Sequence, residues 1–126
     1  MNLYCEISAG ELIDKVSILE IKSEKIKDQT KLLYINKEKQ ILSEEMNKLH
    51  SNTNWLLKMK EINLKLWNVE DNIREKEKLK EFDNEFIEFA RKVYIMNDER
   101  FLIKDQINKY YKSNIMEQKS YQKYAD

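Results

Sequence analysis

The scarcity of proline and glycine is the feature that most constrains how this chain can fold. The sequence of 126 residues contains no proline and a single glycine, Gly10. Tight turns between strands and the loops that surround phosphate groups depend on these two residue types. The apolar side chains recur instead at intervals of three and four residues, which is the spacing of one helix face. The sequence therefore predicts an all-α protein.

The length and the charge pattern predict one folded domain. A chain of 126 residues can bury one modest core but has little room for a second. Charged residues make up 37% of the chain and hydrophobic residues 41%, and the helical periodicity places the charges on solvated helix faces. We expect a single all-α domain over residues 1–126, an antiparallel helical bundle built on a long helical hairpin.

The charge balance argues against two classes of partner. Lysine and arginine together number 23 and are matched by 23 acidic residues, so the electrostatic signature of a nucleic-acid binder is missing. No apolar run approaches the roughly 18 residues of a membrane span, and no secretory pattern begins the chain. The single cysteine, Cys5, excludes an internal disulfide. We expect a cytoplasmic protein that binds neither nucleic acid nor membranes.

The N-terminal residues suggest a second copy of the chain as a partner. Apolar and polar side chains alternate over residues 2–7, which is typical of a strand. Ser8 and Glu11 then form a capping box that starts a helix ending near Lys27. This helix is apolar on two sides, so it is either central in the bundle or buried by another subunit. Because the strand has no mate in the chain, we expect a homodimer.

Cap residues and apolar spacing predict the remaining helices. Thr30 can cap a second helix, and Asp83 can cap a fourth. The second and third helices are expected to form an antiparallel hairpin. The predicted second helix covers about 30–49, and the third begins at 53 or 54. The fourth runs from 83 to about 112, and a short last helix begins at 113 or 114.

Several polar side chains interrupt the apolar stripe of the 83–112 helix. Asn97, Arg100 and Lys104 project close to the line of its apolar residues. On the preceding helix Glu70 lies at the edge of the apolar stripe, and Arg74 follows one turn later. Because buried charges need partners, we predict an interior or cleft-lining network that joins Glu70 and Arg74 to Asn97, Arg100 and Lys104. It is either a layer of structural salt bridges or an anion-binding pocket.

A second polar group lies on the neighbouring face of the same predicted helix. It comprises Arg91, Tyr94, Asp98 and Asp105. Only three positions in the chain hold arginine, at 74, 91 and 100, and arginine supplies a planar fork that lysine lacks. The group is either part of a ligand-binding surface or a solvated face with ordinary pairs within the helix.

Metal-dependent and nucleophilic sites have little support in the sequence. Acidic helices hold Mg²⁺ in all-α nucleotide pyrophosphatases, but the acidic pairs of this chain occur in the wrong order for that class. His50 is the single histidine, which argues against a histidine metal site or a catalytic triad. We expect no metal site and no cofactor, with surface positions for the following carboxylates: Glu11, Asp14, Glu20, Glu70 and Asp71.

Four segments together resemble a known family. They are GELIDKVSILEIKSEKI at 10–26, LWNVEDNIREKE at 66–77, FIEFARKVYIMNDERFLIKDQIN at 86–108 and KSNIMEQKSYQKY at 112–124. The chain resembles an uncharacterised bacterial family of small proteins, a domain of unknown function, over nearly its whole length. The resemblance implies no established activity, but it implies a location near glycosyltransferase and surface-polysaccharide genes. The chain departs from the family pattern at Lys92, a position where a small residue is commoner in the family.

The resemblance also implies a set of functional positions. They are Glu11, Asp14, Lys15, Glu20, Lys22, Glu70, Asp71, Arg74, Arg91, Tyr94, Asn97, Asp98 and Arg100. We expect a non-catalytic binding or accessory protein that engages a partner protein or an anionic small molecule, in surface-glycan synthesis. The alternative is a small Mg-dependent enzyme for a phosphorylated or nucleotide substrate. Its acids would be Glu70, Asp71 and Asp98, and its phosphate ligands Arg74, Arg91 and Arg100.

Overall fold

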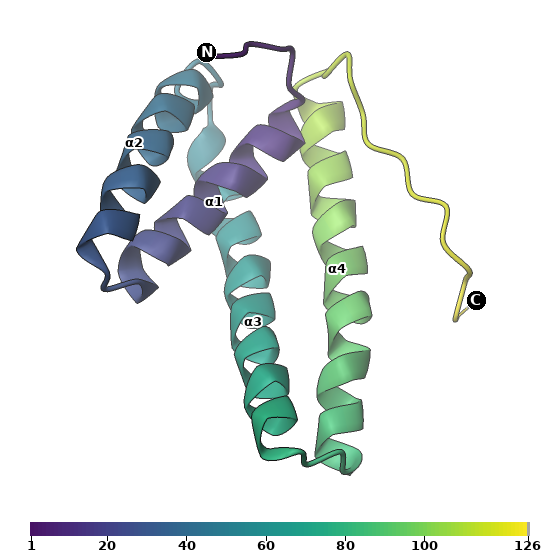
Figure 1. Cartoon of the computed structure of the whole chain (residues 1–126). Coiled ribbons are helices and arrows are strands. Elements are labelled where there is room, and N and C mark those ends of the chain that lie inside the picture. The colour runs from purple at the N-terminus through teal and green to yellow at the C-terminus, as the bar shows by residue number, and fades with distance from the viewer. Residues whose placement is uncertain (126) are drawn as a thin grey trace.

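The computed structural model describes residues 1–125, in which all regular secondary structure is α-helical (Figure 1). Within this range the chain forms four helices. They are α1 (Ala9–Lys25), α2 (Gln29–Met46), α3 (Asn52–Leu79) and α4 (Asn84–Tyr110). The prediction of an all-α fold is confirmed.

Side-chain caps begin two of the helices at the predicted positions. Ser8 Oγ accepts a hydrogen bond from the backbone N–H of Glu11 at 3.2 Å and starts α1. Asp83 Oδ1 accepts one from the backbone N–H of Phe86 at 2.9 Å and starts α4. Each cap satisfies a donor that the first turn of a helix leaves without an intrahelical partner. α4 then continues unbroken to Tyr110, as the sequence predicted.

The cap predicted for the second helix is wrong. Asp28, not Thr30, is the N-cap of α2, and its Oδ1 accepts from the backbone N–H of Lys31 at 2.9 Å. Aspartate is a better cap than threonine, and its charge also interacts favourably with the positive end of the helix dipole. α2 consequently begins before Thr30, at Gln29.

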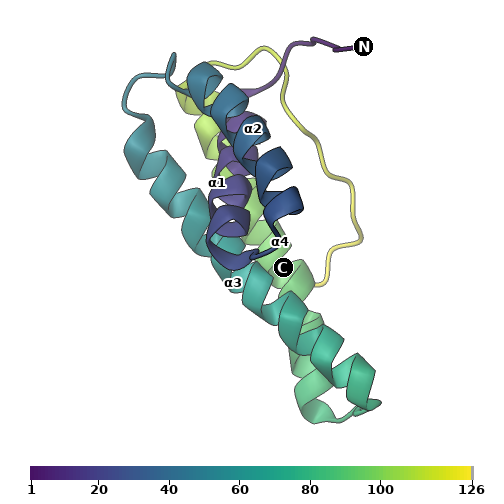
Figure 2. The same ribbon diagram turned by 60° about the vertical axis from the view of Figure 1, so that its left-hand side comes forward.

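The first helix lies at the centre of the bundle. α1 packs against α2, α3 and α4, while α3 packs mainly against α4 (Figure 1). The predicted hairpin between the second and third helices is therefore wrong. α3 and α4 lie side by side in opposite directions, and the loop that joins them projects beyond α1 and α2 (Figure 2). The core gathers around Ile13, Val16, Met59 and Ile107, none of which is more than 1% exposed.

Both ends of the described chain differ from the predictions. Residues 1–7 form no strand and are exposed. Residues 113–125 form no helix, and this C-terminal segment runs extended along α4 (Figure 1). The backbone turns at Lys112, whose φ is 55°, and the N–H of Ser113 donates to the backbone oxygen of Asn108 at 2.9 Å. This arrangement is a typical helix C-terminus, so it stops α4 and directs the segment back over it.

The two observations that predicted a homodimer have explanations within one chain. The two apolar sides of α1 are covered by α2 on one side and by the α3–α4 pair on the other. The N-terminal residues form no strand that requires a mate. The homodimer stays a prediction.

Gly10 permits a close approach of α1 to α4. A Cβ atom added at Gly10 would lie 2.5 Å from the backbone oxygen of Lys104 and 2.8 Å from Asn108 Oδ1. The N–H of Gly10 donates to Asn108 Oδ1 at 2.6 Å, and the neighbouring Ala9 N–H donates to Ser113 Oγ at 3.0 Å. The start of α1 is thus fixed to the end of α4 through its backbone.

Candidate functional site

A buried carboxylate from α1 forms the centre of the site. The side chain of Asp14 is 1% exposed, and Arg100 of α4 binds it with two parallel hydrogen bonds. Arg100 Nε donates to Oδ1 at 3.0 Å, and Nη2 donates to Oδ2 at 2.5 Å. The hydrogen bonds to Asp14 raise the pKa of Arg100 above its ordinary value, although burial opposes this. This paired geometry is specific to the guanidinium fork, which a lysine at position 100 would not reproduce.

α3 contributes an amide to the same carboxylate. Asn63 Nδ2 donates to Asp14 Oδ1 and to Ser17 Oγ, both at 2.8 Å. The Ser17 hydroxyl donates in turn to the backbone oxygen of Asp14 at 2.7 Å. Asp14 therefore joins three helices, and in residues 1–125 no buried side-chain nitrogen or oxygen is left without a hydrogen bond. The polar centre meets the requirement that buried polar groups be paired.

A lysine connects this centre to the C-terminal segment. Lys104 of α4 donates to Glu11 Oε2 at 2.7 Å and to Glu117 Oε2 at 2.8 Å, and its Nζ lies 3.8 Å from Asp14 Oδ2. Burial lowers the pKa of Lys104, but the hydrogen bonds with Glu11 and Glu117 outweigh this and raise it above its ordinary value. We call the connected residues the Asp14 network: Glu11, Asp14, Ser17, Asn63, Arg100, Lys104 and Glu117.

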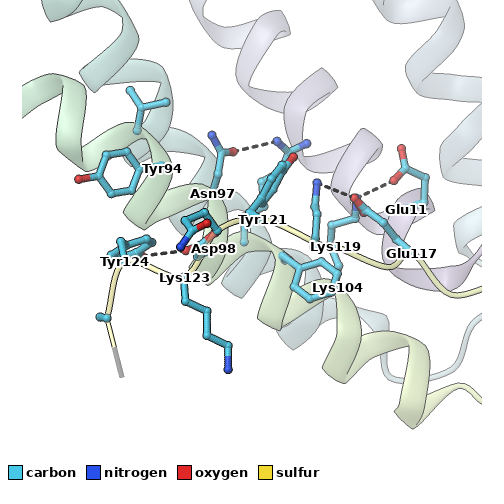
Figure 3. Close-up of a pocket in the computed structure, with 15 residues that line it drawn as sticks. Glu11, Tyr94, Asn97, Asp98, Lys104, Glu117, Lys119, Tyr121, Lys123 and Tyr124 are labelled. Atoms are coloured by element: carbon cyan, nitrogen blue, oxygen red, sulfur yellow. Dashed lines mark hydrogen bonds and ion pairs between the residues drawn. The ribbon is translucent and has the colours of Figure 1, made fainter.

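The C-terminal segment and α4 line a partly open cavity of about 1140 Å³, which we call the tail cavity (Figure 3). The phenol of Tyr124 donates to Asp98 Oδ2 at 2.7 Å, and its ring packs edge-on against Tyr94 with centroids 4.9 Å apart. The hydrogen bond to Asp98 raises the pKa of Tyr124. The lining is mainly aromatic and charged, with the amide of Asn97 among these side chains: Glu11, Tyr94, Asn97, Asp98, Arg100, Phe101, Lys104, Glu117, Lys119, Tyr121, Lys123 and Tyr124.

A second, smaller cavity lies between α1, α3 and α4. Its volume is about 440 Å³, and we call it the Trp67 groove. Asn97 and Arg100 line both cavities. The other residues of the Trp67 groove are Ile18, Ile21, Asn63, Leu66, Trp67, Glu70, Asp71 and Arg74.

The structure brings together only part of the predicted site. Arg100 and Lys104 turn inward, as predicted, but they pair with carboxylates of α1 and of the C-terminal segment. Glu70 and Arg74 line the Trp67 groove together with Asn97 and Arg100, as the cleft-lining prediction required, but they form no hydrogen bond with them, and Arg74 Nη2 is 3.9 Å from Glu70 Oε2. Asn97 remains beside Arg100, with Oδ1 3.4 Å from Nη1.

The second predicted polar group is divided in a similar way. Tyr94 and Asp98 line the tail cavity. Arg91 lies outside both cavities, where it pairs with Glu88 of the same helix at 3.3 Å. Its pKa is raised, chiefly by a hydrogen bond with Tyr94. Asp105 pairs with Lys109 at 2.8 Å on α4.

Sequence reasoning missed the residue at the centre of the network. Asp14 was expected at the surface, whereas its side chain is almost completely buried. Gly10, Asp14, Ser17 and Ile21 are spaced by four, three and four residues, and all four are buried. This spacing describes a packed helix face, which an exposed carboxylate would not occupy. The signal was therefore present in the sequence, as a carboxylate within an apolar seam.

The acids of the predicted metal-dependent enzyme do not share one cavity. Glu70 and Asp71 line the Trp67 groove, whereas Asp98 lines the tail cavity. Across residues 1–125 no three side chains of histidine, cysteine, aspartate or glutamate lie in a group that would hold a metal ion.

The fold and the site define a small all-helical chain with an ionic network at its centre and cavities on two sides. A family of unknown function, DUF6165, matches residues 3–125, so the chain belongs to this family. No curated protein and no solved structure matches the chain. Within the described residues, no helix has the length and apolar character that crossing a membrane requires.

We predict that Glu117 titrates with a pKa of about 2, because Lys104 and Lys119 both donate hydrogen bonds to its carboxylate. An unpaired glutamate has a pKa of 4.5. A depressed pKa stabilises the folded state above the ordinary value, and this stabilisation is lost as the pH falls toward the folded pKa. The C-terminal segment should therefore release between about pH 4.5 and 2. Carboxyl ¹³C NMR measures the titration directly.

A matched variant separates this anchor from general acid unfolding. In Glu117→Gln the amide signals of residues 118–124 should already resemble those of a released segment at neutral pH. They should then change little on acidification, because the titrating group is gone. A Glu117 carboxyl that titrates near 4.5 in the unmodified chain would contradict the prediction.

Proposed function

We propose that this protein is a non-catalytic binding module whose tail cavity takes an anionic small molecule. The observation that supports this most directly is the distribution of charge around the cavity. Four basic residues face three acidic ones there, namely Arg100, Lys104, Lys119 and Lys123 against Glu11, Asp98 and Glu117. The side chains that line the cavity therefore carry one more positive than negative charge, although the whole chain is neutral. A local excess of one sign attracts ligands of the other.

Two of these four cations have hydrogen-bond donors that are available to a ligand, and the other two do not. Lys104 already pairs with three carboxylates, and Lys119 pairs with Glu117 at 2.9 Å. Among residues 1–125 Lys123 forms no ion pair, and Arg100 Nη1 makes only the long contact with Asn97. Phosphate and carboxylate groups are bound by charge-assisted hydrogen bonds from such donors. We assign Lys123 and Arg100 as ligand contacts and Lys104 as a positioning residue.

The aromatic residues of the tail cavity favour a ligand that also has a ring. Tyr94, Phe101, Tyr121 and Tyr124 line the cavity beside the cations. Aromatic side chains bind planar or apolar rings, and their polar edges supply further hydrogen bonds. A cavity of about 1140 Å³ is close to the upper limit for small-molecule sites, which reach roughly 1000 Å³. A phosphorylated compound with a ring, such as a nucleotide, suits this combination.

The rest of the molecule acts as a frame in this proposal. The antiparallel α3–α4 pair and the Asp14 network fix the position of Arg100, so that little ordering is needed when the ligand binds. In this proposal both alternatives that the sequence left open apply: the Asp14 network is the structural salt-bridge layer, and the tail cavity is the anion site. The accessory role in surface-glycan synthesis that the family resemblance implies stays a prediction.

Thermal unfolding in the presence of anions tests the proposal. We expect inorganic pyrophosphate or ATP, at constant ionic strength, to raise the melting temperature in a saturable way, since a ligand at 100 times its Kd adds about 2.7 kcal/mol. Lys123→Ala should weaken binding about tenfold, the equivalent of one charge-assisted hydrogen bond. Lys109→Ala removes an exposed lysine of α4 that lies outside both cavities, and it should leave binding unchanged.

Two results would overturn the anion site. The first is a melting temperature that no anion raises, which would favour a module that binds a partner protein. The second is an equal loss of affinity in the Lys109→Ala and Lys123→Ala variants, which would mean that anions bind the surface without a defined site. Turnover of ATP with Mg²⁺ would instead support the enzymatic alternative.

A further inference from the structure

The Trp67 groove has features that the tail cavity and its anionic ligand do not explain. Its wall is apolar, formed by Ile18, Ile21, Leu66 and Trp67. Its volume of about 440 Å³ falls within the range of roughly 300 to 1000 Å³ that is usual for small-molecule sites. An apolar wall of this kind favours a ligand with an aliphatic or aromatic body.

One accessible polar atom of this groove has no hydrogen-bond partner among the described residues. Asn63 is 6% exposed, and both hydrogens of its amide are used by Asp14 and Ser17. No hydrogen bond within residues 1–125 reaches its Oδ1, although the residue lines the groove. An amide oxygen accepts up to two hydrogen bonds, so this atom remains available as an acceptor. The groove therefore presents an acceptor that a ligand N–H would satisfy.

The charged residues of the groove occur in balanced numbers. Arg74 and Arg100 are its cations, and Glu70 and Asp71 are its anions. The side chain of Arg74 is 78% exposed, and its distance of 3.9 Å to Glu70 is too long for a hydrogen bond. Its guanidinium is therefore free to bind another carboxylate. Arg100 has Nη1 to spare, because Asp14 occupies its other two nitrogens. A ligand that matches this arrangement carries one positive and one negative group.

We infer that the Trp67 groove is a second binding site, for a zwitterion with an apolar body such as a branched-chain amino acid or a short apolar peptide. The ammonium group binds the Asn63 carbonyl oxygen and the Glu70 carboxylate. The carboxylate binds Arg74 and the free edge of Arg100. The aliphatic side chain packs on Leu66 and Trp67. This site differs from the proposed anion site in its cavity and in the charge of its ligand, but the two sites share Arg100 Nη1, so their ligands compete for that donor.

The fluorescence of Trp67 reports on this groove directly. The chain contains two tryptophans, and Trp55→Phe leaves Trp67 as the single reporter. Leucine and leucyl-leucine, which do not absorb where tryptophan does, should change its emission in a saturable way. Leucinamide lacks the carboxylate and N-acetylleucine lacks the ammonium group. Each analogue should bind about tenfold more weakly, because it leaves charged groups of the groove without partners.

A pair of arginine variants tests the location of the site. Arg74→Ala should weaken binding about tenfold, since it removes one charge-assisted contact. Arg91→Ala is the matched control, because Arg91 is also an exposed arginine with an acidic neighbour in its own helix but lies outside both cavities. It should leave binding unchanged. Lys123→Ala should likewise have no effect here, and Arg74→Ala none on pyrophosphate, so each site can fail alone.

Three results would overturn this inference. They are an emission of Trp67 that no probe changes up to about 10 mM, equal binding of leucine and leucinamide, and an equal loss in the Arg74→Ala and Arg91→Ala variants. Isothermal calorimetry with the unmodified protein gives the same comparison if Trp55→Phe does not fold.

Discussion

Arg100→Met is expected to lower the melting temperature by about 10 to 20 °C, the largest effect of any single substitution proposed for this chain. The variant leaves the carboxylate of Asp14 buried without the fork that binds both of its oxygens. Removing one partner of a buried ion pair typically costs about 3 to 5 kcal/mol. For a chain of this size 1 kcal/mol corresponds to about 3 to 5 °C.

The cost arises from the buried charge that remains, and a second substitution tests this cause. In the double variant Asp14→Asn, Arg100→Met the charge is gone, while the amide oxygen at position 14 can still accept the hydrogen bond from Asn63. Replacing both members of a buried pair is often nearly neutral. We therefore expect the double variant to recover at least half of the lost stability, measured by urea unfolding with circular dichroism.

Arg91→Met provides the control for this series. It removes an exposed arginine from the same helix, and it should change stability by less than about 0.5 kcal/mol. If Arg100→Met were as mild as Arg91→Met, the Asp14 network would contribute little to stability. If the double variant were no more stable than Arg100→Met, the remaining charge would not be the cause.

The local signals in the sequence were sufficient for most of the helical structure. A cap acts over three residues, so Ser8 and Asp83 could be recognised without knowledge of the fold. The unbroken course of α4 also follows from local spacing. The same kind of signal misled at Thr30, where two potential caps lie within three residues of each other and the better one starts the helix. Propensity identifies an element more reliably than its boundary.

The packing order of the helices was not accessible from the same signals. Apolar stripes show that a helix face is buried, but they do not identify the helix that covers it. The hairpin of the second and third helices was predicted because they are neighbours in the chain. The structure pairs α3 with α4 instead, and α1 takes the central position. The two apolar sides of α1 were therefore an indication of its place in the bundle.

The sequence predicted which cations turn toward the candidate site, but it did not predict the acidic residues that pair with them. Arg100 and Lys104 interrupt an apolar stripe, and this showed correctly that they turn inward. Their partner Asp14 precedes Arg100 by 86 residues, so no spacing rule connects the two. Glu117 lies in a segment without regular structure, where helical periodicity has no meaning. Pairing across such distances depends on the tertiary fold.

Gly10→Ala is expected to destabilise the protein by about 1 to 3 kcal/mol, although alanine is the better helix former. The added Cβ would lie 2.5 Å from the backbone oxygen of Lys104 and 3.1 Å from its carbonyl carbon. A flexible side chain could move aside at little cost, but these atoms belong to the backbone of α4. The start of α1 must therefore shift, which also lengthens the hydrogen bond from the Gly10 N–H to Asn108.

Asn36→Ala measures the opposing contribution of helix propensity. Asn36 lies exposed within α2, so alanine there should gain up to about 0.7 kcal/mol without any steric conflict. The two variants should thus differ in the sign of their effect on urea unfolding, although both introduce alanine into a helix. A stabilising Gly10→Ala would mean that α1 and α4 separate there at no cost. The contact through Gly10 would then not fix the position of Lys104 beside Glu11.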